Sequence, residues 1–434
     1  MKNKIVKIVG GGLAGAEAAL YLAKKGVKVK LYDIKPTKHT PAHISDNYVE
    51  LVCSNSLKSN DVYSNAAGLL KQEMRLMGSN VISVADLTRV PAGNALAVNR
   101  ELFSSIITDK IKSETNIECI NEEITSFTSD IMLIATGPLT TEALSNAISL
   151  KVGDSLHFYD ASAPIVTAES IDKECSFFGD RYDKGDKDHI NCPMTKEEYE
   201  VFYQELISAE RANLKDFEKS DVFEGCMPVE IMARRGVDTL RFGPLKPAGL
   251  TNPKTGRWAY ATLQLRREDE SGTMYNLVGF QTNLKFKEQK RVFSLIPALK
   301  NAEFVRYGVM HRNTYINSPE VLKDDLSLLK EENIYFAGQI TGVEGYVESA
   351  VTGLVAGIQI YRKLKGLLPL KFPLETVTGA LLNYITTKNV DFQPMNANFA
   401  ILPPLNKVIK DKAERKRLQA ERSLKAINDI LKEI

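Results

Sequence analysis

Five cysteines offer the widest choice of chemistry in this sequence, because a thiol can form a disulfide, ligate a metal or attack a carbon atom. They stand at Cys53, Cys119, Cys175, Cys192 and Cys226. Their number is odd and no two are spaced as Cys-x-x-Cys, which argues against a disulfide framework and against a structural zinc site. We therefore expect free thiols, no metal site and a reducing compartment, the cytoplasm.

A glycine-rich segment near the start has the spacing of a phosphate-binding turn. The pattern Gly-x-Gly-x-x-Gly is formed by Gly10, Gly11, Gly12, Leu13, Ala14 and Gly15. It follows a β-branched run that predicts a strand over 4–9 and opens an alanine-rich segment that predicts a helix closed by Gly26. A second strand is predicted over 27–32 and ends at Asp33.

Each part of this unit has a role in holding a dinucleotide. The first glycine permits the tight turn, the second lets the backbone approach a pyrophosphate, and the third lets the helix pack closely on the strand. The helix N-terminus stabilises the phosphate charge, and Asp33 can bond the ribose hydroxyls. The sequence therefore predicts a dinucleotide site at its N-terminal end.

Two later strand-to-turn segments indicate that the dinucleotide is FAD. MLIATGP, residues 132–138, contains Thr136 and Gly137, and YFAGQITGVEGY, residues 335–346, contains Gly338, Gln339 and Tyr346. Both resemble segments of flavoproteins that have two dinucleotide-binding folds, the second of which brings a helix N-terminus to the flavin. That second segment usually has Gly-Asp, where this sequence has Gly-Gln. We expect Tyr346, near Glu344, to face the flavin ring or to belong to the core.

Composition and charge are those of an ordinary globular protein with two or three domains. The 434 residues are 44% hydrophobic and 25% charged, with a formal net charge of +2. Any nucleic-acid surface must therefore come from local clusters of basic residues. No apolar run approaches the roughly 18 residues that span a bilayer, so we expect no membrane partner.

The order of predicted elements indicates one domain interrupted by another. Strand–turn–helix units occur at the start and again after 334, whereas the segment between them mixes short strands, a helix over 196–209 and Gly- and Pro-rich turns. We predict an α/β fold with a Rossmann-type FAD-binding domain made of 1–155 and 326–434. An α+β domain that binds substrate is predicted as an insertion over 156–325.

Further segments match one known family almost from end to end. They are IVGGGLAGAEAA, TPAHISDNYVELVCSNSLKSN, VPAGNALAVNR, RYDKGD, NCPMT, VFEGCMPVEIMARRG, FGPLKPAGL, YNLVGFQTNLK, RYGVMHRNTYINSP, AGQITGVEGYVESA and FQPMNANF. The chain resembles the TrmFO family, folate- and FAD-dependent tRNA (uracil-5-)-methyltransferases related to the GidA flavoproteins. It departs at Asn94, where the family tends to have glycine, and at Asn99, where it tends to have aspartate. Both departures fall in a predicted loop, where they could tune substrate choice.

The resemblance implies the reaction and its participants. Methylenetetrahydrofolate would supply the carbon, FAD the hydride, and NADH or NADPH would reduce the flavin again. Uracil C5 becomes nucleophilic once a thiolate adds at C6, so the family's two cysteines, Cys53 and Cys226, are expected to act. We assign the attack to Cys226, because Arg234 and Arg235 follow it closely, and the second thiol role to Cys53. The two assignments can be exchanged, and the other three cysteines are expected to be inert.

Clustered basic side chains are candidates for contacts with RNA phosphates or with folate. Those expected to bind are Arg234, Arg235, Lys285, Lys287, Lys290, His311 and Arg312, with further clusters at Arg266–Arg267 and from Lys407 to Arg417. A solvated surface is the alternative for each cluster. The expected partners are therefore RNA and folate, and the sequence does not define an oligomeric state.

Four functions fit these features to different degrees. The first is methylation of uridine 54 in the tRNA T-loop, and the second is the same chemistry on a uridine of 23S rRNA. A GidA-like protein that modifies a wobble uridine with a partner GTPase is the third, although that family is longer. A small-molecule flavin oxidoreductase is the fourth, but it would need neither the basic clusters nor the two cysteines.

Overall fold

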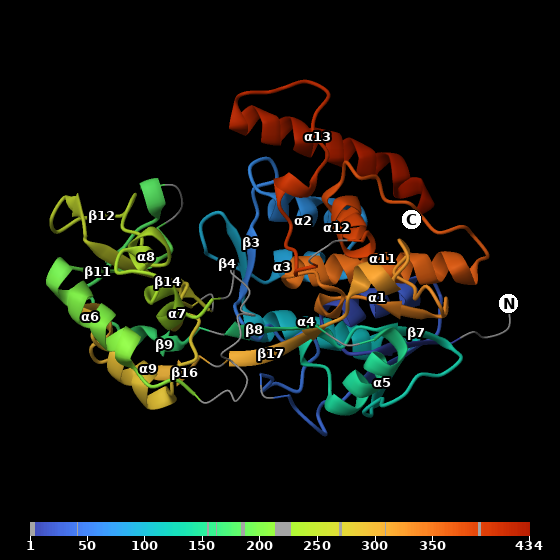
Figure 1. The fold of residues 1–434 in the computed structure, drawn as a ribbon, viewed down its shortest axis with the longest axis horizontal. Helices are drawn as coiled ribbons and strands as arrows, with labels where there is room; N and C mark the ends of the chain where they lie inside the picture. Colours follow the sequence, from blue (N-terminus) through green and yellow to red (C-terminus); the bar gives the residue numbers. More distant parts are fainter. Residues whose placement is uncertain are drawn as a thin grey trace.

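The protein is described from a computed structural model. It describes residues 5–40, 42–153, 156–161, 163–183, 187–212, 227–268, 271–308, 310–388 and 392–434, without the side chains of 156–161 and 310–313. Figure 1 shows two units side by side, one holding both ends of the chain and the other formed by its green to yellow-orange middle part.

A five-stranded parallel sheet forms the centre of the first unit. Its order is β18 (Ile334–Phe336), β7 (Ile131–Ile134), β1 (Val6–Val9), β2 (Val29–Asp33) and β6 (Ile117–Asn121). The strands predicted at 4–9, 27–32, 131–135 and 334–337 are thus confirmed within two residues at each end. Their apolar runs are buried, as parallel strands covered on both faces require.

Helix α1 (Leu13–Lys24) packs against α11 (Tyr346–Leu364) through small residues. A Cβ atom placed on Gly353 would lie 2.1 Å from the carbonyl oxygen of Ala14, so the two backbones are in direct contact there. The next contact, between Gly357 and Ala18, is one turn further along both helices, which shows that they run parallel. Both N-termini therefore point toward the same edge of the sheet.

Shorter elements complete the first unit. They are β3 (Ser56–Ser59), α2 (Ala66–Leu76), α3 (Asn80–Leu87), β4 (Arg89–Val90), β5 (Ala95–Val98), α4 (Arg100–Ser113), α5 (Glu142–Val152), α10 (Ser318–Val321), α12 (Val377–Thr386) and α13 (Lys412–Ile430). Strand β3 is mostly polar and has no clear strand pattern in the sequence. The basic cluster from Lys407 runs into α13, whose Ala420 and Ile427 are fully buried in the first core.

Two buried carboxylates hold these helices together. Glu17 of α1 accepts hydrogen bonds from the Ser79 hydroxyl and from the backbone N–H groups of Asn80 and Val81, at the start of α3. Glu73 of α2 does the same at the start of α12 and also accepts from Ser423 of α13. Burial raises the pKa of both carboxyl groups, and the bonds from helix N-termini oppose that shift.

The second unit has a six-stranded sheet and its own hydrophobic core. The order is β10 (Phe177–Phe178), β11 (Ile190–Met194), β14 (Ala261–Arg267), β15 (Met274–Leu277), β9 (Ile165–Thr167) and β16 (Phe304–Arg306), with every pair antiparallel. Four helices and a hairpin accompany it: α6 (Lys196–Ser208), α7 (Val229–Ala233), α8 (Thr239–Phe242), α9 (Phe286–Phe293), and the strands β12 (Thr251–Asn252) and β13 (Arg257–Trp258). The helix predicted over 196–209 is confirmed as α6.

The chain enters and leaves the second unit through one antiparallel ribbon. Strand β8 (Leu156–Ala161) pairs with β17 (Met310–Tyr315) along its whole length. Paired entry and exit strands are the geometry expected of an insertion into a loop of the first unit. Among the described residues, no helix is long and apolar enough to cross a membrane.

Candidate functional site

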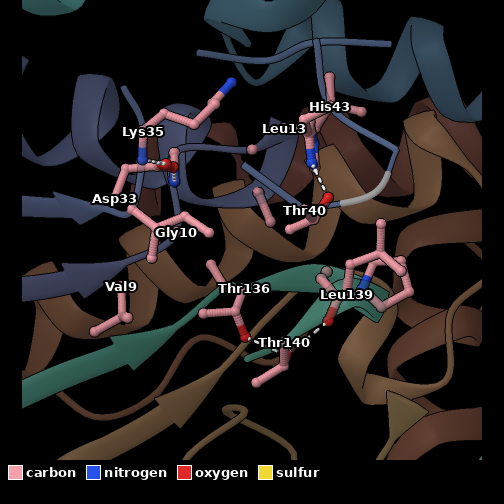
Figure 2. Close-up of a pocket in the computed structure, with 18 of the residues that line it drawn as sticks. Val9, Gly10, Leu13, Asp33, Lys35, Thr40, His43, Thr136, Leu139 and Thr140 are labelled. Carbon is pink, nitrogen blue, oxygen red and sulfur yellow. Dashed lines mark hydrogen bonds between the residues drawn. The ribbon is translucent and has the colours of Figure 1, made fainter. Parts of the chain in front are cut away.

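A cleft lies at the edge of the parallel sheet where β1, β2 and β7 end. The space between its walls is about 1160 Å³, including the open solvent at its mouth. Figure 2 shows its walls, formed by the turn after β1, the segment after β2 and the segment after β7. The residues predicted to bind the cofactor that line it are Gly10, Gly11, Gly12, Leu13, Ala14, Asp33, Thr136, Gly137, Gly338, Gln339 and Tyr346.

Gly15 does not line the cleft, because it lies where α1 packs on the glycine turn. A Cβ atom on Gly15 would lie 1.9 Å from the carbonyl oxygen of Gly10, so α1 rests directly on the turn. A Cβ on Gly12, the residue that precedes α1, would meet no atom within 4 Å. The backbone at the start of α1 therefore faces open space, as the approach of a pyrophosphate to a helix N-terminus requires.

Asp33 has a fixed orientation at the end of β2. Its carboxylate accepts hydrogen bonds from the backbone N–H of Gly11 at 2.7 Å and of Lys35 at 2.9 Å. These two contacts link the glycine turn to the second strand. The remaining lone pairs of the carboxylate can accept from ribose hydroxyls in the cleft.

Several polar residues of the cleft were not singled out in the sequence. Lys35, Thr40, His43 and Glu50 line it, and the Nδ1 atom of His43 lies 2.6 Å from the Thr40 hydroxyl. Burial lowers the pKa of His43, and the nearby Lys35 charge adds to that shift, so the imidazole is neutral near pH 7. Thr40, His43 and Glu50 belong to one of the family-like segments, but their spacing alone carries no chemical signal.

Gln339 stands where related segments have aspartate, and it has its own partner. Its amide donates to the carboxylate of Glu344 at 2.5 Å. Glu344 is buried and is not among the residues that line the cleft.

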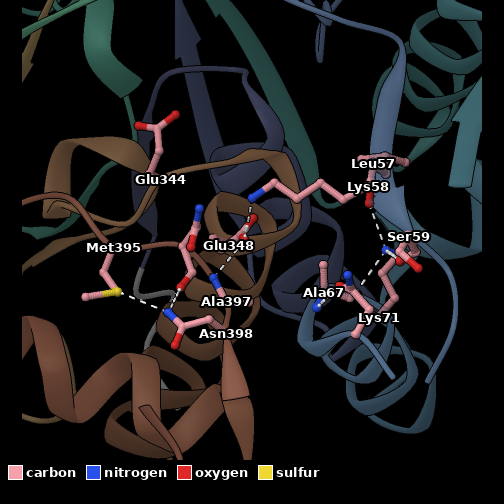
Figure 3. A network of polar contacts seen from close by, with 12 residues as sticks. Leu57, Lys58, Ser59, Ala67, Lys71, Glu344, Glu348, Met395, Ala397 and Asn398 are labelled. Atoms are coloured by element: carbon pink, nitrogen blue, oxygen red, sulfur yellow. Dashed lines mark hydrogen bonds and ion pairs between the residues drawn. The ribbon is translucent and has the colours of Figure 1, made fainter. Parts of the chain in front are cut away.

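The first turn of α11 is held by a buried carboxylate (Figure 3). Glu348 accepts from the Lys58 amine at 2.9 Å and from the backbone N–H of Ala397 at 3.0 Å. On the other side of Lys58, the buried amine of Lys71 donates to three backbone carbonyls. These bonds fix the start of α11 and with it the position of Tyr346.

Tyr346 connects the cleft to Cys53. Its hydroxyl oxygen accepts the backbone N–H of Cys53 at 2.7 Å and of Ser54 at 3.1 Å. Burial raises the pKa of Tyr346, and the Cys53 thiol contributes, so the hydroxyl stays protonated near neutral pH. Val52, the neighbour of the half-buried Cys53, lines the cleft, which places the Cys53 loop (residues 51–55) at its margin.

Two arginines hold the same loop from other elements. Arg100, at the start of α4, donates to the carbonyl of Leu51 at 2.8 Å and pairs with Glu268. Arg266 of β14 donates to the Ser54 hydroxyl at 2.6 Å and to the Asn55 side chain at 3.1 Å. The Cys53 loop is thus held by guanidinium groups from both units.

These contacts correct one expectation from the sequence. Arg266 was grouped with the surface clusters for RNA phosphate, but its guanidinium binds Ser54 and Asn55 at the junction of the two units. Asn99, which ends the loop before α4, accepts the N–H of Leu102 and caps that helix, and its role in substrate choice stays a prediction. An asparagine and an aspartate both perform the capping role.

The remaining predicted residues are not all visible at the site. Cys226 lies outside the described residues, and of His311 and Arg312 only the backbone, in β17, is described. Arg234 is the C-cap of α7 and donates to the carbonyl of Ile207, and Arg235 follows in a turn. On α9 and its cap, Lys285 pairs with Glu210, while Lys287 and Lys290 are exposed.

Comparisons with known proteins agree with this architecture. Residues 5–367 match the family model described as glucose inhibited division protein A. The chain is 56% identical to the methylenetetrahydrofolate–tRNA-(uracil-5-)-methyltransferase TrmFO of Caldicellulosiruptor bescii, with 99% of each chain covered. It is 55% identical to the protein of the same name from Aquifex aeolicus, over 100% of this chain and 97% of the relative.

The solved structure of Aquifex aeolicus GidA has the same fold. It superposes with a TM-score of 0.72 at 16% identity, over 99% of this chain and 76% of GidA. The α/β architecture predicted from the sequence is thereby confirmed.

Proposed function

The chain belongs to the TrmFO family of GidA-related proteins, and we propose that it is a methylenetetrahydrofolate- and FAD-dependent RNA (uracil-5-)-methyltransferase. Its proposed product is 5-methyluridine at position 54 of the tRNA T-loop. The observation that carries this proposal is the Cys53 loop, which lies at the margin of a dinucleotide cleft on the hydroxyl of Tyr346. A flavoprotein that only oxidised a small molecule would need no thiol there.

The residues of the cleft fit a bound FAD. The open backbone at Gly12 suits the pyrophosphate, Asp33 suits the ribose, and the start of α11 at Tyr346 suits the flavin end. When bound and reduced, FAD supplies the hydride, and methylenetetrahydrofolate supplies the carbon unit. NADH or NADPH is the proposed source of the electrons.

The chain itself supplies the activation of uracil. A thiolate adds at C6, which makes C5 nucleophilic toward the one-carbon unit, and a second group then removes the C5 proton. We assign the addition to Cys226 and the second role to Cys53. Arg100 and Arg266 hold the loop that positions Cys53 for this role. The target uridine must leave its base stack to reach such a site.

A direct assay distinguishes the candidate RNAs. The protein would be incubated with methylenetetrahydrofolate, a reduced nicotinamide and unmodified transcripts of tRNA or of 23S rRNA, and 5-methyluridine mapped by mass spectrometry. We expect product at position 54 of the tRNA. Product only in 23S rRNA would support the same chemistry on the alternative target, and product in neither RNA would remove the methyltransferase proposal.

Cysteine variants test the two thiol roles. Cys226→Ala and Cys53→Ala are each expected to abolish formation of 5-methyluridine while the protein keeps its flavin absorbance. Cys175→Ala is the matched control, because Cys175 is half-buried and packs against the core of the second unit. Full activity of either catalytic variant would contradict the role assigned to that cysteine.

A further inference from the structure

One segment of the inserted unit has the composition of an RNA-binding surface. Residues 241–260 contain four basic residues, no aspartate or glutamate, and the single tryptophan of the chain, Trp258. The segment bears α8 and the β12–β13 hairpin, which lie together at the end of the inserted unit far from α1 and α11 (Figure 1). None of the residue roles derived above uses it.

Three aromatic side chains around this segment are exposed to solvent. Trp258 is 54% exposed, Phe242 79% and Tyr182 59%. Large aromatic side chains are normally mostly buried, and a group of them on a surface marks a contact site.

Hydrogen bonds and strand register link the segments that carry these rings. Tyr182 donates its backbone N–H to the carbonyl of Gly249 at 2.7 Å. Its ring covers that glycine so closely that a Cβ atom placed on Gly249 would lie 2.9 Å from a ring carbon of Tyr182. Two residues later, Thr251 pairs with Trp258 across the hairpin. Phe242 ends α8, whose Arg241 donates to the carbonyl of Tyr260 next to β13.

The backbone holds Tyr182 in a conformation that non-glycine residues rarely adopt. Its φ and ψ are 59° and 30°. This left-handed geometry costs about 1 to 2 kcal/mol for a residue with a side chain. The bonds to Gly249, and that of the Arg181 side chain to the carbonyl of Ala248, maintain it. The ring is thereby fixed against Gly249 with more than half of its surface exposed.

The charges on this surface favour an anionic partner. Arg241 pairs with Asp238, and Lys254 pairs with Glu174 at 3.0 Å, both on exposed side chains. Lys246 and Arg257 are exposed and have no carboxylate partner among the residues that the structure describes. Exposed ion pairs are weak, so a phosphate can replace Glu174 at Lys254.

We propose that this hairpin surface, formed by Tyr182, Phe242, Lys246, Lys254, Arg257 and Trp258, binds unpaired nucleotides of the RNA substrate. The aromatic rings stack on bases while the neighbouring cations contact phosphates, the combination by which proteins hold single-stranded segments of RNA. The proposal rests on RNA being the substrate, and it adds a docking site remote from the cleft. A protein partner would need carboxylates that match these cations.

The single tryptophan provides a direct readout. The FAD-loaded protein would be titrated with a tRNA transcript while tryptophan emission is recorded, and saturable quenching is expected as a base stacks on Trp258. In parallel, binding of labelled tRNA would be measured for Trp258→Ala and for Trp258→Phe, which keeps a ring. The alanine variant is expected to bind about 5- to 100-fold more weakly, and the phenylalanine variant to retain most of the affinity. Leu150→Ala, at an apolar side chain that is 90% exposed on α5, is the control and should bind normally.

The phosphate contacts are tested by the salt dependence of binding. The double variant Lys254→Gln, Arg257→Gln is expected to reduce the slope of log affinity against log salt by about 1.4 to 1.8, compared with no change for Lys330→Gln in the first unit.

If tryptophan emission did not change and Trp258→Ala bound tRNA normally, the proposal that the hairpin surface binds RNA would be wrong. The proposed function would still stand if the same preparation formed 5-methyluridine. If the alanine variant bound tRNA normally but changed the sedimentation mass of the protein, the surface would be a protein contact and the proposal would equally be wrong. Absence of any tRNA binding by the unaltered protein would remove both proposals.

Discussion

Removing the hydroxyl of Tyr346 tests how the cleft and the Cys53 loop are connected. In Tyr346→Phe the ring stays in the lining of the cleft, but the backbone N–H groups of Cys53 and Ser54 lose their acceptor. Each orphaned, half-buried donor costs about 1 kcal/mol, so the native arrangement of the loop should lose about 2 kcal/mol. If the reaction needs that arrangement, turnover falls by up to about thirtyfold.

Three measurements separate this effect from a loss of cofactor. Flavin absorbance of the purified variant should be normal, formation of 5-methyluridine should fall, and alkylation of Cys53 by iodoacetamide should change in its pH profile. Tyr21→Phe is the matched control, because its hydroxyl also makes a backbone hydrogen bond, to Ile434 at the far end of α1. A Tyr346→Phe protein with full turnover and an unchanged Cys53 profile would refute the reasoning. So would one that released its flavin, since the ring remains.

Three further predictions concern the framework. Gly353→Ala places a methyl group 2.1 Å from the carbonyl oxygen of Ala14, so it should separate α11 from α1 and reduce flavin retention in a gel-filtration assay. Gly179→Ala is the control and should retain flavin normally, because its new Cβ has only ordinary contacts. Glu73→Gln removes acceptors for helix N–H groups and hydroxyls, and should lower the free energy of unfolding in urea by about 2 to 4 kcal/mol and expose α13 to proteolysis. Burial lowers the pKa of Lys71 from 10.5 to about 7, so between these values the unfolded chain carries a proton that the folded one has lost. The free energy of unfolding should therefore rise with pH from about 7 to 10, and Lys71→Met should lack this part of the rise.

The sequence predicts the parallel sheet well, because its signals are local. The β-branched runs, the glycine turn and the alanine-rich helix lie within a few residues of one another, and the structure has β1, α1 and β2 in that order. Strand β3 escaped prediction for the opposite reason. Its residues, Ser56–Ser59, are mostly polar, and they form a strand because they pair with β5, nearly forty residues later.

The same division applies to the candidate site. The glycines and Asp33 were identified by spacing, since one turn positions all of them. Arg100 and Arg266 were not, because their contacts with the Cys53 loop join segments up to 212 residues apart and no periodicity records such a meeting. Even with the family resemblance, Arg266 was assigned only to a basic cluster. The sequence does not show whether an arginine side chain is exposed or already bonded to other residues.

The Cys53 loop joins parts of the molecule that the dinucleotide cleft does not need. The walls of the cleft come from the first unit, so that unit determines cofactor binding. The loop is held by Tyr346 and Arg100 of the first unit and by Arg266 of the second. A displacement of the second unit, such as RNA docking on it would produce, is therefore transmitted to the residues beside Cys53 through the guanidinium of Arg266. Tyr346 belongs to the cleft lining and binds the same loop, so the Cys53 loop contacts both the cleft and the second unit.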